Sequence, residues 1–414
     1  MMMMGDVMAI VHGTVIDGTG AEPIEDGAVV ISDGRVEAVG ESGAVEVPEG
    51  AETIDATGRT VMPGLIEGHS HVGGDARAQQ ILRISLQRGI TTVCTVHAGK
   101  QGAAQSGDLS GIALRDGIAS GQIRGCARLV AGAIVTPTFG HVRYRDADGP
   151  WEVRKAVREM VQAGADFIKT AASGGFVGKN EVCAMRNYTL EELSALVDEA
   201  HAWFRPVVVH CHTQPGLDTC IEAGVDQIHH GAFIDEEAVR GIFERDLWYM
   251  PTLSVTCQRN IDALSDQPWQ TVEMTEAQPI HRAGVRLAYE VGVKLCVGTD
   301  YPGTGRTWKH GDRTIWELME LEACGLSRME ALLAATKTNA EAYRLDDLGT
   351  LEPGKIADMV VLDGDPLAGF DALYDHRNVK LVMKDGKVEF ADGDLAKHYT
   401  LKESQPADRP AYDD

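Results

Sequence analysis

Basic residues and long apolar runs are scarce in this 414-residue sequence. It holds 38 Lys and Arg against 62 Asp and Glu, a formal net charge of −24 at pH 7. Nucleic acids and anionic membranes bind basic surfaces, so this balance argues against both as partners. No window approaches the ~18 consecutive apolar residues of a membrane-spanning helix. With 44% hydrophobic residues, the composition is that of an ordinary folded protein.

Signals for export and for disulfide pairing are also missing. The first eight residues contain Asp6 and no Lys or Arg, so they lack the basic region of a secretory signal. The eight Cys form no C-x-x-C pair, and several, such as Cys94 and Cys296, lie inside apolar runs. Buried free thiols in a reducing compartment are typical of this pattern. We therefore predict a cytoplasmic protein without a disulfide framework.

Short β-type runs occupy both ends of the chain. Residues 8–57 alternate such runs with turns, and the same texture returns at residues 359–390. Asp33-Gly34, Asp363-Gly364 and Asp385-Gly386 are hairpin signals there. Neither end has enough strands to bury a sheet face alone. We predict one small β-sandwich domain built from residues 1–58 and 349–414, with a polar tail from residue 396.

Between these ends, residues 59–348 alternate apolar strands with helical stretches. Thr189 followed by Glu192, for example, predicts a helix start with a capping box. Eight βα units make a closed parallel (β/α)8 TIM barrel, so the predicted class is α/β. An open doubly wound sheet would show a Gly-rich turn after its first strand, and none is present. The strands are expected at 60–66, 90–95, 129–135, 167–169, 206–209, 227–228, 249–253 and 294–297.

Ionisable residues follow several of these strands, at the ends that form the mouth of such a barrel. His69-x-His71 and His210-x-His212 each place two imidazoles on one face of a strand, as a metal pair requires. A single His-x-His is about as often a structural pair. The other residues at strand ends are His230, Lys169 and Asp300. Each of the last two has a structural alternative, because Lys169 could be a buried lysine paired with an acid and Asp300 could cap a helix. Coincidence at five strands is improbable.

Together these residues resemble a known family. Residues 63–71 (PGLIEGHSH), with Lys169, His210, His230 and Asp300, are similar to the binuclear metal type of the amidohydrolase superfamily. Residues 349–360 are similar to the segment with which the chain of that family re-enters its small β domain. Phe139-Gly140-His141 and the fourth and sixth strand segments resemble the branch of imidazolonepropionase-like proteins and Xaa-Pro dipeptidases.

The resemblance implies a cofactor set and roles for its ligands. His69, His71 and Asp300 would hold a buried divalent ion, and His210 and His230 a more exposed one. Lys169, carboxylated by CO₂ to a carbamate, would bridge both. Two Zn²⁺ ions ~3.5–4 Å apart lower the pKa of a shared water toward ~7. Asp300 would accept the proton of this water and pass it to the departing nitrogen.

Two further His are candidate substrate contacts. His141 resembles a position that contacts a substrate carboxylate in the dipeptidase branch, although a surface loop His is the alternative. His212 stands where relatives often carry Tyr, and both a substrate contact and a supporting place behind the metal ligands stay open. His229 stands where relatives often show Glu, so a different residue type supports the metal ligands from that position. Cys211 is expected to pack on the opposite strand face.

The predicted function is metal-dependent hydrolysis of an amide C–N bond in a small molecule, either a dipeptide or an N-acyl amino acid. Cyclic amides, ureas and carbamates stay open as alternatives. A mononuclear deaminase is disfavoured because Lys169 is present and Thr213 stands where such enzymes carry Glu. A scaffold that lost its metals is disfavoured because all six ligands are present. A homo-oligomer is expected, and residues 304–310 suit an anionic or aromatic substrate.

Overall fold

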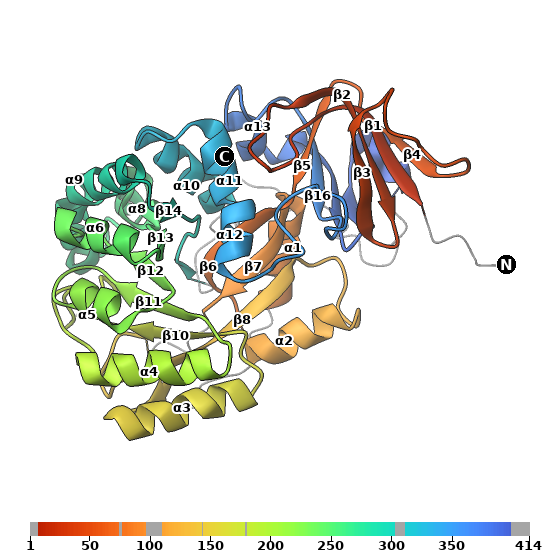
Figure 1. The fold of residues 1–414 in the computed structure, drawn as a ribbon. Helices are drawn as coiled ribbons and strands as arrows, with labels where there is room; N and C mark the ends of the chain where they lie inside the picture. The colour runs from red at the N-terminus through yellow and green to blue at the C-terminus, as the bar shows by residue number, and fades with distance from the viewer. Residues whose placement is uncertain are drawn as a thin grey trace.

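Two sheets organise the molecule, which we describe from a computed structural model. The structure describes residues 7–73, 77–96, 110–142, 144–178, 180–302 and 311–398. One sheet is mixed and lies at one end of the molecule, and the other is parallel, curled and surrounded by helices (Figure 1). The predicted 304–310 loop, and the tail beyond residue 398, lie outside the described residues.

The mixed sheet contains strands from both ends of the chain. Its order is β18-β17-β16-β5-β1-β2-β3, with β4 on β1. β5 pairs parallel with β1 and antiparallel with β16, so one strand joins the two halves. The bounds are β1 Met8–Val15, β2 Ile24–Ser32, β3 Arg35–Glu41, β4 Glu52–Asp55, β5 Arg59–Pro63, β16 Met359–Asp363, β17 Val379–Lys384 and β18 Lys387–Ala391.

Residues from both halves of this sheet share one buried core. Ile10, Val29 and Ile54 pack with Met359 and Leu381, and each is at most 1% exposed. Burial of such side chains stabilises the domain by ~1.5–3 kcal/mol each. The two halves therefore depend on each other for most of their apolar burial.

Two of the three predicted Asp-Gly turns form hairpins. Asp33-Gly34 joins β2 to β3 and Asp385-Gly386 joins β17 to β18, with φ positive at all four residues. Paired positive φ angles give the primed turns whose twist suits a hairpin. Asp363-Gly364 does not form one, because β16 is followed by α13 (Asp371–Tyr374) and η1 (His376–Asn378) before β17 begins.

The parallel sheet keeps its strands in chain order. β14 continues through residues 296–300 into β15 (Tyr301–Pro302), which pairs with β6. Gly68 N also donates to Val297 O at 3.0 Å, so residues 294–302 bond to both ends of the curled sheet. The other strands are β6 Leu65–His71, β7 Ile90–Thr95, β8 Arg128–Thr136, β10 Phe167–Ala171, β11 Val207–Cys211, β12 Gln227–His230, β13 Trp248–Met250 and β14 Lys294–Leu295, with β9 (Arg145–Asp146) on β8.

Predicted and observed strand bounds differ at several places, and two of these differences have a clear structural cause. The run 60–66 is divided between β5 and β6 at Gly64, where the chain passes from one sheet to the other. A Cβ at Gly64 would lie 2.2 Å from Thr91 Oγ1, so only glycine allows this close passage. The run 249–253 ends as a strand at Met250 because Thr252 adopts a left-handed φ of 53° and α7 (Leu253–Thr256) follows.

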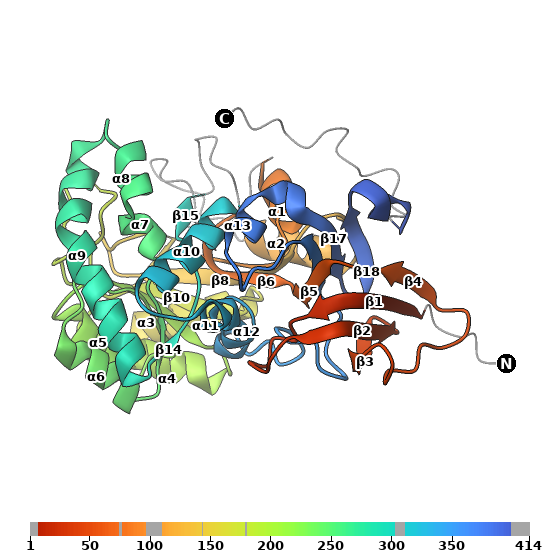
Figure 2. The ribbon, with the colours of Figure 1, turned by 90° about the horizontal axis from the view of Figure 1, so that it is seen from above.

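Helices pack around the outside of the curled sheet (Figure 2). The predicted capping box is present, with Thr189 Oγ1 accepting from Glu192 N at the start of α4. Among the residues that the structure describes, no helix combines the length and apolarity needed to cross a membrane. The bounds are α1 Ala78–Gln87, α2 Ser110–Ala119, α3 Pro150–Gln162, α4 Leu190–Ala202, α5 Gly216–Ala223, α6 Glu236–Glu244, α8 Gln258–Ala263, α9 Pro268–Val291, α10 Asp312–Ala323, α11 Arg328–Ala334 and α12 Lys337–Ala342.

Candidate metal-binding active site

The carboxyl edge of the curled sheet carries the predicted site residues. Parallel strands end at one edge of a sheet, so residues far apart in sequence meet there. The residues come from β6 (His69, His71), β10 (Lys169), β11 (His210), β12 (His230) and the segment between β14 and β15 (Asp300). His212 directly follows β11.

One group consists of His69, His71 and Asp300. Asp300 Oδ1 lies 3.2 Å from His69 Nε2 and 2.8 Å from His71 Nε2. Burial raises the pKa of Asp300, but the charge and hydrogen bond of His69 outweigh it, so the pKa lies well below its ordinary value. Burial lowers the pKa of His69 to about 3. An ionised carboxylate beside two imidazole rings is a donor set for a divalent metal.

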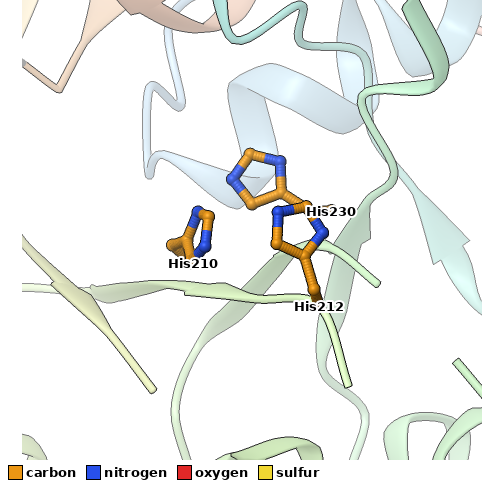
Figure 3. Close-up of side chains that lie close together, drawn as sticks. All are labelled: His210, His212 and His230. Carbon is orange, nitrogen blue, oxygen red and sulfur yellow. The ribbon is translucent and has the colours of Figure 1, made fainter. Parts of the chain in front are cut away.

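The second group consists of His210, His212 and His230, whose ligand atoms lie within 4.8 Å of one another. His210 and His212 extend from one strand end toward His230 on the neighbouring strand (Figure 3). All three are at most 3% exposed. The His212 ring stacks on His230 at 4.8 Å between centroids. The sequence predicts a substrate contact or a supporting residue at His212, which lies within this group of ligand-type residues.

Lys169 is buried, with 1% exposure, and its Nζ has no hydrogen-bond partner among the described residues. Burial lowers the pKa of Lys169 to about 7, against the opposing effect of the Asp300 carboxylate. Burial is the largest cause of the lowered pKa of His69 in the first group and of His210 in the second. The charge of Lys169 also lowers both pKa values, so the amine lies close to both groups. The alternative of a buried Lys paired with an acid finds no partner within the described part of the chain.

Several buried nitrogen atoms at this edge are left without partners. They are Lys169 Nζ, His212 Nδ1 and His230 Nε2, judged over the described residues. An unpaired buried polar group destabilises a protein by ~1–3 kcal/mol, so such groups are rare unless they bind something. The residues present therefore fit divalent metal ions, for which imidazole nitrogens and the Asp300 carboxylate are suitable donors.

The partner atoms of three His orient their rings. Thr252 Oγ1 lies 2.8 Å from His230 Nδ1, which leaves Nε2 toward the site. His69 Nδ1 lies 2.8 Å from His229 Nδ1, which leaves Nε2 toward Asp300. His210 Nε2 lies 3.0 Å from Gly174 O. Bonds to the outer ring nitrogen commonly set the direction and tautomer of a ligand His.

Glu67 is a buried carboxylate that sequence reasoning did not select. It accepts from His69 N and Thr299 N at 2.9 Å each, and from Thr314 Oγ1 at 2.7 Å. Burial raises the pKa of Glu67 to about 7. Its contacts join β6 to the residue before Asp300, so Glu67 fixes the spacing of the first group. An acid between the apolar pair Leu65-Ile66 and the His69-x-His71 pair was the available signal.

Backbone strain gathers at the same edge. His230, Asp300 and Thr252 have φ angles of 79°, 51° and 53°, in the left-handed region that non-glycine residues rarely adopt. Each such residue destabilises the fold by ~1–3 kcal/mol and persists where the surrounding contacts hold it. Strained residues of this kind cluster at functional sites, which agrees with the placement of the ligand-type groups.

His141 lies against the second group rather than on the surface. Its ring stacks on His210 at 3.9 Å between centroids, and its side chain is 9% exposed. His141 Nδ1 lies 2.7 Å from Glu181 Oε1. A Cβ at Gly175 would lie 2.5 Å from His141 Cε1, so glycine is needed for this packing. The sequence does not predict Glu181, because no local pattern indicates that its loop lies against the loop of His141.

This curled parallel sheet, with ligand-type residues along its carboxyl edge, is the arrangement of a family of hydrolases. The model of the amidohydrolase family matches residues 60–388, and the chain belongs to that family. An Aspergillus niger ochratoxinase is 27% identical over 433 aligned positions, which cover 92% of this chain and 86% of that protein. A Nocardia farcinica imidazolonepropionase is 26% identical, covering 82% of this chain and 85% of that protein.

A solved structure gives the same picture of the whole fold. A Xaa-Pro dipeptidase with methionine bound in its active site has a TM-score of 0.82 and 28% identity to this chain. The match covers 93% of this chain and 100% of that one. The resemblance to the amidohydrolase superfamily, with its imidazolonepropionase and dipeptidase relatives, is confirmed.

Proposed function

We propose that this protein is a binuclear metal-dependent hydrolase that cleaves the amide C–N bond of a dipeptide or an N-acyl amino acid. One observation carries the proposal: the unpartnered, buried Lys169 amine shares one sheet edge with two groups of ligand-type residues. A single metal would need only one of those groups. Membership of the amidohydrolase family and the dipeptidase and ochratoxinase relatives support an enzyme that hydrolyses such bonds.

The family resemblance implies which residues would hold each ion. His69, His71 and Asp300 would hold one ion, His210 and His230 the other, and Lys169 would bridge them as a carbamate formed with CO₂. Imidazole nitrogen and carboxylate oxygen are donors that suit zinc. When bound, the ions would supply Lewis acidity and lower the pKa of water toward neutrality.

In this proposal Asp300 moves the proton. Both of its His contacts use Oδ1, which leaves Oδ2 to accept a proton from the attacking water. The same oxygen would then donate this proton to the amide nitrogen as the C–N bond breaks. The low pKa of Asp300 keeps its carboxylate ionised, as a metal ligand requires.

In this proposal His141 binds the substrate carboxylate. Its Nδ1 lies 2.7 Å from Glu181 Oε1, which leaves Nε2 as the ring nitrogen available to a substrate. A hydrogen bond to a charged group contributes ~1.5–3 kcal/mol. We expect His141→Ala to lower kcat/KM roughly tenfold to a hundredfold for a carboxylate substrate, and far less for the matching C-terminal amide, in steady-state assays of both. Equal losses on both substrates would reject this role.

A substrate screen tests the proposed function as a whole. Protein reconstituted with Zn²⁺ and bicarbonate is assayed on dipeptides, N-acyl amino acids, cyclic amides, ureas and carbamates. We expect turnover in the first two classes, bound metal near two equivalents per chain, and loss of turnover after chelation. A preferred substrate without a carboxylate would shift the assignment to the other three classes, and one equivalent of metal would contradict the binuclear site.

The finer architecture belongs to the same proposal. Because residues 294–302 bond to both ends of the curled sheet, we infer a closed (β/α)8 barrel. Because β5 lies in the mixed sheet, we draw the first domain boundary at Pro63 rather than at residue 58, and keep residues 349–414 in the small β-sandwich domain. The cytoplasmic location and the homo-oligomer stay predictions.

A further inference from the structure

A cavity of about 550 Å³ lies between the loop after β8 and the loop after β10. Residues 137–140 form one wall, and Glu181 and residues 185–187 form another. Glu181 connects the cavity to the site, because its Oε1 lies 2.7 Å from His141 Nδ1 and the His141 ring stacks on His210. One imidazole ring therefore separates this cavity from a candidate metal ligand. Its size is that of a small-molecule site.

The walls of this cavity combine apolar surface with a positive charge. Phe139 is 75% exposed and Met185 is 39% exposed, so both present apolar surface to a ligand. Glu181 is already engaged by His141 and by Gly175 N at 3.1 Å. Arg186 lines the cavity, and no carboxylate of the described residues forms an ion pair with it. Of the two charged residues among the described lining, Arg186 is therefore the one whose charge is available to a ligand.

The backbone around Arg186 is bonded to the segment that follows β10. Its backbone forms an antiparallel bridge with Ser173, just beyond the end of β10. Gly174 N donates to Met185 O at 2.8 Å, and Asn187 Nδ2 donates to Ser173 O at 3.0 Å. Ser173 Oγ in turn accepts from His212 N at 2.9 Å. Binding groups on a rigid framework keep a fixed distance from the reacting centre.

We propose that this cavity binds the side chain of the substrate's C-terminal residue, and that Arg186 recognises an acidic group at the end of that side chain. The inference rests on the proposed function, in which His141 binds the α-carboxylate at the inner edge of the cavity. The side chain then runs outward over Phe139 and Met185, and its carboxylate meets the guanidinium. A glutamate side chain has the methylene stem and the terminal charge that this path requires.

The test compares three substrates that share one acyl group and end in Glu, Gln or Leu. Glu and Gln have the same length and differ in charge. A charge-assisted bond is worth ~1.5–3 kcal/mol, so wild-type kcat/KM is expected to favour Glu over Gln by roughly tenfold to a hundredfold. Arg186→Gln is expected to remove this preference and leave Gln and Leu substrates within about twofold of wild type.

Two variants sharpen the result. Arg186→Lys keeps the charge and is expected to retain part of the preference for Glu. Arg245→Gln removes an exposed arginine that follows α6, at the opposite edge of the sheet, and should change nothing. Equal losses on all three substrates for Arg186→Gln, or a wild-type enzyme indifferent to Glu and Gln, would overturn the inference.

Binding measurements separate this inference from the proposed function. Calorimetry with the metal-loaded protein measures the affinity for the Glu and Gln compounds without requiring turnover. If none is hydrolysed, a preference for Glu that Arg186→Gln abolishes would uphold the subsite and reject the proposed function. If the Glu compound binds no better than the Gln compound, the subsite is rejected whatever the enzyme hydrolyses.

Discussion

Replacing Asp300 with Asn is expected to lower kcat at least ~10²-fold on every substrate that the protein hydrolyses. The amide cannot take the proton of the attacking water, and it removes the charge that contacts His69 and His71. Asn tolerates the left-handed backbone of this position, where φ is 51°, so the fold should persist. Circular dichroism, metal analysis and steady-state kinetics on one preparation measure the three effects separately.

Asp246→Asn is the matched control for this variant. Asp246 also has a left-handed backbone, with φ at 56°, but its side chain is 86% exposed and contacts Lys294. It should leave kcat within about twofold, because surface substitutions usually change little. Normal turnover by Asp300→Asn with both ions bound would assign proton transfer to a different residue.

Lys169→Ala is expected to reduce bound metal well below two equivalents and to lower kcat at least as much as Asp300→Asn. Without the amine no carbamate can form, so nothing in the chain bridges the two groups of ligand-type residues. Wild-type protein should take up more Zn²⁺ when bicarbonate is added, and the variant should not respond. Metal analysis with and without bicarbonate measures this difference.

Lys384→Ala controls for the loss of a buried lysine. Lys384 is 6% exposed and lies in β17, where its Nζ is 3.4 Å from Asp385 Oδ2. This variant should lose stability without losing metal or the bicarbonate response. Undiminished metal in Lys169→Ala would contradict a bridging carbamate and leave a site of two independent groups.

Local sequence patterns predict most of the strands and helices. The wrong predictions lie where the strand with which a segment pairs determines its structure. The run 60–66 reads as one apolar strand, yet Gly64 divides it between two sheets. That division depends on β16, almost 300 residues away, which no local pattern can identify. Asp363-Gly364 has the same letters as Asp385-Gly386, but helical residues follow it instead of a strand.

In the candidate site, too, features set by neighbouring residues could be predicted, and contacts between distant segments could not. His69-x-His71 and His210-x-His212 were visible because the spacing of two on a strand is local. The contacts of Glu67 with Thr299, and of His141 with Glu181, join segments that only the folded chain brings together. The difference between a ligand-type position and a substrate contact for His212 depends on where His230 lies, which sequence spacing cannot give.

The mixed sheet combines strands from both ends of the chain, and this has a consequence for synthesis in the cell. β1–β5 leave the ribosome first, but β16 follows about 300 residues later, so β5 waits with an unpaired edge for most of translation. At ~5–20 residues per second this wait lasts roughly 15–60 seconds. An exposed edge strand is a template for aggregation during that time. Chaperone binding to nascent chains should therefore concentrate on residues 59–63 and end when residues 359–363 emerge.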